Sequence, residues 1–234
     1  MTLTTRAAAF LHQQERRTDP YHAPQELAKA FDNVGLVPSA ALLAFQQEYA
    51  GLVLYAGLTP IYFGLVHPKV HHRWLRSPVT RYEPDFWEPD ADTPIRHVRC
   101  AATDYQADFT LDENGGYYEG FQQQASSFAG VIEDCAVWAE AWATGYHQRW
   151  VHGLEEAEHM LPTATLCAAL QVEAYPAFPE DLIFWGRNET LLVRQSSDSL
   201  TLIAREPFDP LLVSHYQQLL HLPPKQWART GALT

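Results

Sequence analysis

Cysteine is scarce in this 234-residue chain, which contains only Cys100, Cys135 and Cys167. The number is odd and no Cys-x-x-Cys pair occurs, which excludes a disulfide framework and a zinc ribbon and is typical of a reducing cytosol. Basic residues are also few, because 16 Lys and Arg stand against 28 Asp and Glu, a net charge of −12. Such a surface repels phosphate backbones and anionic lipids, so nucleic-acid and membrane-surface binding are not expected.

Long hydrophobic runs are limited to one charge-free stretch, Tyr49 to Val66. Its 18 residues reach the lower limit for a membrane-spanning helix. Pro60 lacks an N–H and breaks a helix in the middle of such a span, so two buried strands that meet at a turn over 57–60 are favoured. Residues 1–17 do not have the pattern of a signal peptide, and a cytoplasmic location is expected.

The remaining composition is that of an ordinary globular protein. Hydrophobic residues make up 47% of the chain, and 11 Tyr, 11 Phe and 7 Trp supply large core side chains. The length allows one elaborated domain or two small ones that share an interface. Helices are predicted over Gln25–Phe31 and Pro38–Ala50, and a long proline-rich loop over His67–Pro94.

The middle of the chain predicts a strand, a hairpin and a helix. Tyr105–Asp112 alternates apolar and polar residues, as a half-buried strand does, and Asn114-Gly115 then favours a tight type I′ turn. Residues 117–121 supply the returning strand. Ser126 or Ser127 can cap a helix whose predicted buried face holds the apolar positions Phe128, Val131, Ile132, Cys135, Trp138 and Trp142.

The last third repeats this order, with three predicted strands followed by a helix. Asp209 as N-cap and Pro210 at the first helical position mark the start of that helix. The predicted class is therefore α+β, an antiparallel or mixed β-sheet with helices packed on one face. Residues 1–150 and 151–234 form its two predicted parts, or together one continuous domain. The predicted elements are Leu182–Trp185, Thr190–Arg194, Ser199–Ala204 and Pro210–Leu220.

Two segments resemble the SUKH superfamily. Val34–Leu52 (VGLVPSAALLAFQQEYAGL) is similar to its opening helix, and Leu111–Ala136 (LDENGGYYEGFQQQASSFAGVIEDCA) to its Asp-x-x-Gly hairpin and closing helix. Val37 replaces the usual Leu, and Ala50-Gly51 stands where Gly-Gly is common. The resemblance implies a non-enzymatic binding fold, which bacteria use largely in immunity proteins that neutralise toxins, often nucleases, and fungi use in a cell-wall regulator. The expected function is binding of a toxin, and the alternative is a regulatory or scaffold module.

An enzyme is the second class of function to consider. The sequence contains no Gly-x-Ser-x-Gly elbow, His-Glu-x-x-His zincin motif, dinucleotide fingerprint or phosphate-binding loop. On a helix, His152, Glu156 and His159 would share one face and could bind zinc or iron, the site of a metal-dependent hydrolase. Gly153 interrupts this segment and no fourth ligand is evident, so no metal and no cofactor are expected.

One acidic segment is the predicted partner-binding site. Between Tyr82 and Ile95 no Lys or Arg occurs, and prolines stiffen the chain. A solvated acidic loop is the simpler interpretation. An exposed tryptophan is typical of a binding anchor, however, and the acids would attract a basic toxin domain. The predicted site consists of Glu83, Asp85, Phe86, Trp87, Glu88, Asp90 and Asp92.

Overall fold

The computed structural model divides the chain into two compact units. It describes residues 2–18, 23–56, 59–71, 79–89, 94–103, 108–120, 122–153, 160–175, 182–197, 199–206, 210–220 and 227–230. Unit 1 contains Met1–His12 and Gln124–Thr234, and unit 2 contains Gln13–Gln123. The division differs from the predicted boundary at residue 150, because the long central helix belongs with the C-terminal segment.

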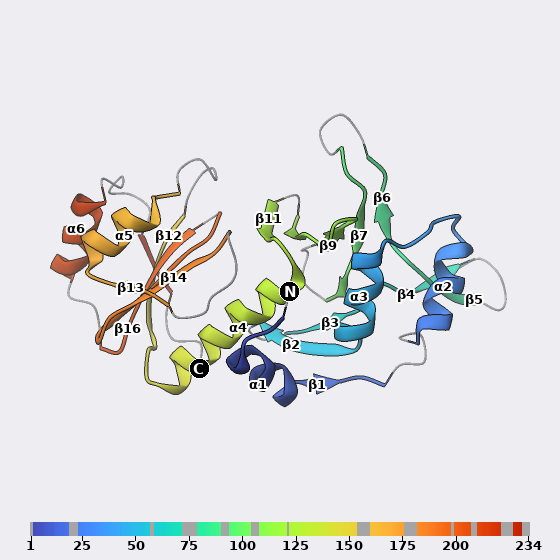
Figure 1. The fold of residues 1–234 in the computed structure, drawn as a ribbon, viewed down its shortest axis with the longest axis horizontal. Helices are drawn as coiled ribbons and strands as arrows, with labels where there is room; N and C mark the ends of the chain where they lie inside the picture. The colour runs from blue at the N-terminus through green and yellow to red at the C-terminus, as the bar shows by residue number, and fades with distance from the viewer. Residues whose placement is uncertain are drawn as a thin grey trace. The chain divides into compact units, whose positions relative to one another are not determined.

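Unit 2 contains two helices near its start and a series of short strands (Figure 1). Helices α2 (Pro24–Asp32) and α3 (Ala40–Tyr49) match the two predicted helices. Ser39 caps α3 by accepting a hydrogen bond from the Leu42 backbone N–H, and Gly51, which follows the helix, has a left-handed φ of 83°. The strands are β1 (Glu15–Arg16), β2 (Leu52–Ala56), β3 (Thr59–Phe63), β4 (His67–His71), β5 (Val79–Glu83), β6 (Phe86–Trp87), β7 (His97–Arg99), β8 (Ala101–Ala102), β9 (Phe109–Asp112), β10 (Tyr117–Glu119) and β11 (Gln122–Ala125).

The charge-free stretch forms two paired strands, as predicted. β2 and β3 are antiparallel, with Val53 opposite Tyr62, and they lie in a sheet of order β1-β2-β3-β8. A second sheet has the order β11-β10-β9-β7-β6, and β4 pairs with β5. Among the described residues, no helix has the length and apolar character needed to cross a membrane.

The predicted loop over 67–94 is wrong for most of its described residues, which form β4, β5 and β6, while 72–78 and 90–93 lie outside the described residues. These strands escape sequence analysis for a physical reason. β6 contains only two residues between Pro84 and Pro89, and it lies at the edge of its sheet, where proline is tolerated because the outer N–H needs no partner.

The hairpin at Asn114-Gly115 is confirmed, but its turn is not type I′. β9 and β10 pair with Leu111 opposite Tyr117, and only Gly115 of the two turn residues has a positive φ, 93°. Asp112 explains the difference, because its Oδ1 accepts hydrogen bonds from the backbone N–H groups of Asn114 and Gly116. β9 is also buried on both faces over residues 109–112, so the half-buried prediction is wrong there.

Unit 1 is built around one antiparallel sheet with helices on both faces, whereas the sequence predicts helices on one face only. Among the described residues the strand order is β13-β14-β15-β16-β12-β17. The helices are α1 (Thr5–Gln13), α4 (Phe128–Ala143), α5 (Thr163–Leu170) and α6 (Pro210–Leu219). The strands are β12 (Gln148–Gly153), β13 (Glu173–Ala174), β14 (Phe184–Arg187), β15 (Leu191–Gln195), β16 (Ser199–Ala204) and β17 (Trp227–Thr230). The α+β class is confirmed.

Alternation along the strands of unit 1 separates two hydrophobic clusters. One side of the sheet packs against α4 through Trp185, Leu192 and Ile203, which contact Val137 and Ala141 of the helix. The other side carries Leu191, Val193, Leu200 and Leu202, which pack with Leu166 and Leu170 of α5 and with Leu220 after α6. Because neighbouring residues in a strand point to opposite faces, each strand supplies both clusters.

Helix α4 begins as predicted and buries the predicted Phe128 and Ile132, but its buried face also includes residues that were not predicted. Ser127 is its N-cap and accepts a hydrogen bond from the Gly130 backbone N–H. Cys135 is only half-buried, whereas Glu133 is completely buried. The Glu133 carboxylate accepts hydrogen bonds from the Thr4 backbone N–H (2.6 Å) and the Thr4 hydroxyl (2.8 Å). The buried carboxylate therefore holds the N-terminal segment of unit 1 against α4.

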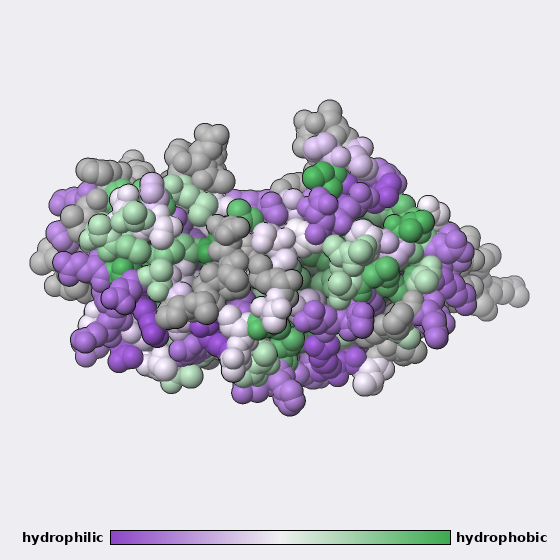
Figure 2. Space-filling view, viewed as in Figure 1, coloured by the Kyte–Doolittle hydropathy of each residue, from purple (hydrophilic) through white to green (hydrophobic). Residues whose placement is uncertain are grey.

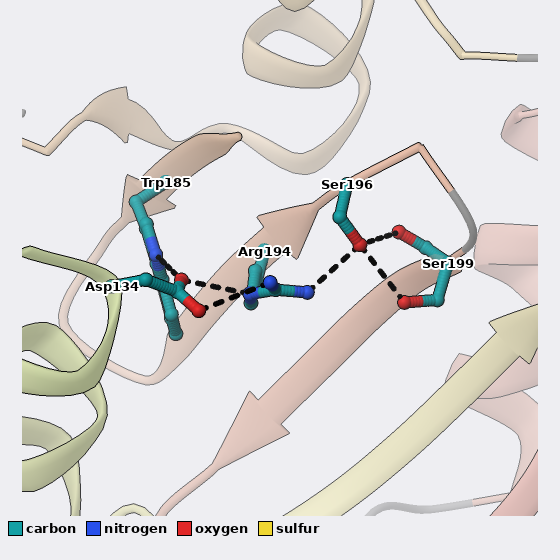
Figure 3. Close-up of polar contacts among 5 residues, drawn as sticks. All are labelled: Asp134, Trp185, Arg194, Ser196 and Ser199. Carbon is teal, nitrogen blue, oxygen red and sulfur yellow. Dashed lines mark hydrogen bonds and ion pairs between the residues drawn. The ribbon is translucent and has the colours of Figure 1, made fainter. Parts of the chain in front are cut away.

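A second polar network joins α4 to the sheet of unit 1 (Figure 3). Asp134 accepts hydrogen bonds from Arg194 Nε (2.8 Å) and Nη2 (3.0 Å) and from Trp185 Nε1 (2.7 Å). Arg194 Nη1 donates to the Ser196 hydroxyl at 2.8 Å, and that hydroxyl lies 3.1 Å from the Ser199 hydroxyl. Arginine stays protonated and cannot act as a general base for serine, so the network is structural.

Gln171, which ends α5, should tolerate glycine with a gain in stability. Its φ of 52° lies in the left-handed region, where a Cβ costs energy that glycine avoids. Gln171→Gly should raise Tm by roughly 1–3 °C, corresponding to about 0.5–1 kcal/mol. Gln171→Ala keeps the Cβ and should leave Tm nearly unchanged. A thermal melt followed by circular dichroism compares the two variants, and a lower Tm for the glycine variant would contradict this explanation.

Candidate functional site

The predicted partner-binding residues lie on and beside an edge hairpin of unit 2. β6 pairs with β7, with Phe86 opposite Val98 and Trp87 opposite His97. The hairpin extends away from the rest of the unit (Figure 1), and hydrophilic side chains gather along it (Figure 2). Glu83 ends β5, while Asp85 and Glu88 flank β6. Asp90 and Asp92 lie outside the described residues.

Two arginines on and beside β7 form ion pairs with acidic residues of this hairpin. Arg96 binds Glu88 at 2.9 Å and Glu113 at 3.2 Å. Arg99 lies 3.5 Å from Asp85 and 2.5 Å from Asp108. Sequence reasoning missed both arginines because it considered only residues 82–95. These ion pairs are partly exposed and therefore contribute little to stability.

Trp87 is half-buried, so the expected exposed tryptophan is not observed. The Arg99 guanidinium lies 5.6 Å from the centre of its ring, a cation–π contact. Arg99 and the Trp87 ring therefore form one composite surface, which Asp85 and Asp108 hold in place through their ion pairs with Arg99.

Acidic residues are concentrated around this hairpin far beyond the predicted segment. Residues 82–120 contain ten acidic and two basic residues, a net charge of −8, against −12 for the whole chain. This region supplies β6, β7, β9 and β10, which are neighbours in one sheet. Two thirds of the net negative charge of the chain therefore falls within residues 82–120, and the two arginines there offset only a minority of the acidic residues.

A buried polar cluster supports the hairpin from within. His97 Nδ1 lies 3.2 Å from the Thr110 hydroxyl, and the Tyr118 hydroxyl donates to Asp112 Oδ2 at 3.1 Å. The rings of His97 and Tyr118 meet edge to face at 4.5 Å. Burial lowers the pKa of His97, an effect that Asp112 opposes, and burial together with Asp112 raises the pKa of Tyr118 to about 12.

The space beside this cluster is too small for a substrate. A cavity of about 20 Å³ lies among Trp87, His97, Asp108, Thr110 and Gly120. That volume corresponds to roughly one water molecule. The cluster can therefore fix the positions of β7, β9 and β10, while recognition of a larger molecule has to use the outer surface of the hairpin.

The predicted metal ligands do not share a helical face. His152 lies in β12, opposite Leu200 of β16, and its side chain is buried. Glu156 and His159 lie outside the described residues. Sequence spacing alone cannot show that the segment around His152 pairs with β16, about fifty positions away. Within the described part of the chain, no group of three His, Cys, Asp or Glu side chains could bind a metal ion.

Compared with models of known protein families, with curated proteins and with solved structures, the chain gives no match in any of the three. The geometry and charge of the hairpin surface are therefore the basis for interpreting its function.

Proposed function

We propose that the chain is a protein-binding module, and specifically an immunity protein that neutralises a basic, nuclease-type toxin domain by direct contact. The acidic hairpin β6–β7 is the proposed contact surface. The observation that carries this proposal is the concentration of a net charge of −8 in residues 82–120 of a chain whose total is −12. A nuclease that binds nucleic acid carries a basic surface, which such a field attracts.

The composition of the hairpin surface supports the same function. Aromatic residues and arginine are enriched in the residues that dominate binding energy, and here Trp87 and Arg99 lie together. Pro84 and Pro89 restrict the chain on both sides of β6, which lowers the entropy cost of association. The resemblance of Val34–Leu52 and Leu111–Ala136 to the SUKH superfamily is consistent with toxin neutralisation.

Cell protection is the first test of this function. Expression of the chain should protect cells from a toxin domain encoded beside its own gene, and the purified proteins should form a complex. If the neighbouring genes encode no toxin and no basic protein binds the hairpin, the immunity proposal fails.

Binding kinetics with the purified toxin domain test the role of the hairpin. Five changes, Glu83→Gln, Asp85→Asn, Glu88→Gln, Asp90→Asn and Asp92→Asn, should slow association about tenfold or more and flatten its dependence on salt. Trp87→Ala should mainly speed dissociation, by roughly tenfold to a hundredfold. Surface plasmon resonance at several salt concentrations measures both rates.

Matched controls separate local from global charge effects. Amide replacement of Asp32, Glu48, Glu173, Glu189 and Glu206, all exposed, changes the net charge by the same five units but leaves the hairpin unchanged. Trp142→Ala removes an exposed tryptophan of the other unit. If the control variants and the hairpin variants bind with equal rates while they stay folded, the partner contacts another surface.

A further inference from the structure

Unit 1 contains a cavity of about 1080 Å³ that is independent of the acidic hairpin. It lies beside the C-terminal end of α4, at the end of the sheet where the β14–β15 turn and the last residues of β16 meet. Clefts of roughly 300–1,000 Å³ hold most small-molecule ligands of proteins. The size of this cavity therefore allows a ligand larger than a single amino acid.

Each of two buried tyrosines in the lining has an arginine guanidinium packed on its ring. The Arg187 guanidinium lies 4.8 Å from the centre of the Tyr175 ring, and the Arg205 guanidinium lies 4.7 Å from that of Tyr146. The Tyr146 hydroxyl is within 3.2 Å of the Asn188 and Glu189 backbone carbonyls, to which it can donate. The rings are thus fixed in the fold, and stacking on them positions both arginines.

The register of the sheet places Arg187 on the side of the sheet that packs against α4. Arg187 is opposite Leu192, and Leu192 is opposite Ile203, so all three point to the same side. Arg205 directly follows the last residue of β16, and its guanidinium packs on Tyr146 in the lining of the same cavity. The two arginines therefore reach one cavity from separate segments of the chain.

Carboxylates line the same cavity without neutralising these arginines. Glu173, Glu189 and Glu206 are exposed at its rim, and Glu140 bonds the Tyr175 hydroxyl. Within the described residues, neither Arg187 nor Arg205 forms an ion pair, although Glu173 lies directly opposite Arg187 in the strand register. A ligand in this cavity can therefore contact both positively and negatively charged side chains.

We propose that this cavity binds a ligand that carries both a carboxylate and an ammonium group, the chemistry shared by free amino acids and short peptides. Arg187 and Arg205 bind the carboxylate, and the rim glutamates bind the ammonium group. A purely anionic ligand would meet four carboxylates and only two arginines, and a purely cationic ligand would meet the two arginines. The mixed lining favours a zwitterion because only a zwitterion pairs both kinds of group.

Nuclear magnetic resonance of the full ¹⁵N-labelled chain provides the test, with glycine, tetraglycine, N-acetyl-tetraglycine amide and inorganic phosphate as probes. Backbone signals of residues 187–192 and 204–206 should shift saturably with tetraglycine. The blocked peptide, which has the same backbone but neither terminal charge, should have no effect. Saturation by glycine as well as tetraglycine identifies free amino acids as a source, and saturation by tetraglycine alone identifies peptides.

Variants connect the response to the two arginines. Arg187→Gln and Arg205→Gln should each weaken tetraglycine binding about tenfold, the effect of one lost charge-assisted hydrogen bond. Arg187→Lys keeps the charge and should retain part of the affinity, and Arg99→Gln in unit 2 should have no effect. The proposal is overturned if the blocked peptide binds as well as tetraglycine, if phosphate alone shifts these signals, or if no probe shifts them.

Discussion

Asp134→Ala is expected to lower the free energy of unfolding of unit 1 by about 3–5 kcal/mol, because it leaves a largely buried arginine without its counter-ion. Arg194 and Asp134 are 14% and 13% exposed, and their contact is bidentate. Burial and the positive charge of Arg194 lower the pKa of Arg149. Removal of the carboxylate leaves the repulsion between these two arginines uncompensated and the Trp185 indole N–H without its acceptor.

A double-mutant cycle tests this explanation. Arg194→Leu combined with Asp134→Ala removes both charges and should recover a substantial part of the loss, since no unpaired charge stays buried. Asp32→Ala, which removes an exposed carboxylate of α2, should change the stability by less than about 0.5 kcal/mol. Urea unfolding followed by tryptophan fluorescence measures all variants. Additive effects of the two changes would show that the pair is not coupled.

Truncation after Gly153 is expected to abolish the fold of unit 1. The shortened chain keeps α4 but loses β13 to β17, and with them Tyr175, Trp185, Leu192 and Ile203, which cover Val137 and Ala141. The apolar face of α4, beside which Trp138 packs, is then exposed to water, and aggregation should follow. Solubility and the cooperativity of thermal melting measure the result.

The fragment Gln13–Gln123 provides the matched comparison. It contains the residues of unit 2 and should therefore stay soluble and melt cooperatively. A fragment 1–153 that also melts in one cooperative, soluble transition would show that α4 does not depend on the C-terminal sheet.

Local signals in the sequence predicted several elements correctly. The spacing of apolar residues and the Ser127 cap located α4, and the turn residues on either side located β15 and β16. These predictions succeeded because capping and hydrophobic periodicity depend on residues within one or two turns of each other. Gly115 was likewise expected at a turn, where its positive φ is observed.

Predictions of what each element contacts were less successful. The buried face of α4 includes Ala129, Ala136 and Glu133, because small residues allow close packing and Thr4, about 130 positions away, binds the carboxylate. His152 was considered as a metal ligand on a helix, but it lies in β12, whose residues pair with β16. Neither partner can be identified from the periodicity of the segment itself.

For the candidate sites too, local features could be predicted from the sequence and long-range contacts could not. By itself, the sequence determined the acidic character of residues 82–95, the presence of Trp87 and the α+β class, because composition and local pattern suffice for these. Only the tertiary structure brought Arg99 onto the Trp87 ring, paired Arg96 with Glu88, buried His152 and gathered Arg187 and Arg205 at one cavity. The neighbours of a charged side chain and the lining of a cavity depend on strand register and long-range packing. These bring together residues that are far apart in the sequence, so the local pattern around each residue does not reveal its partners.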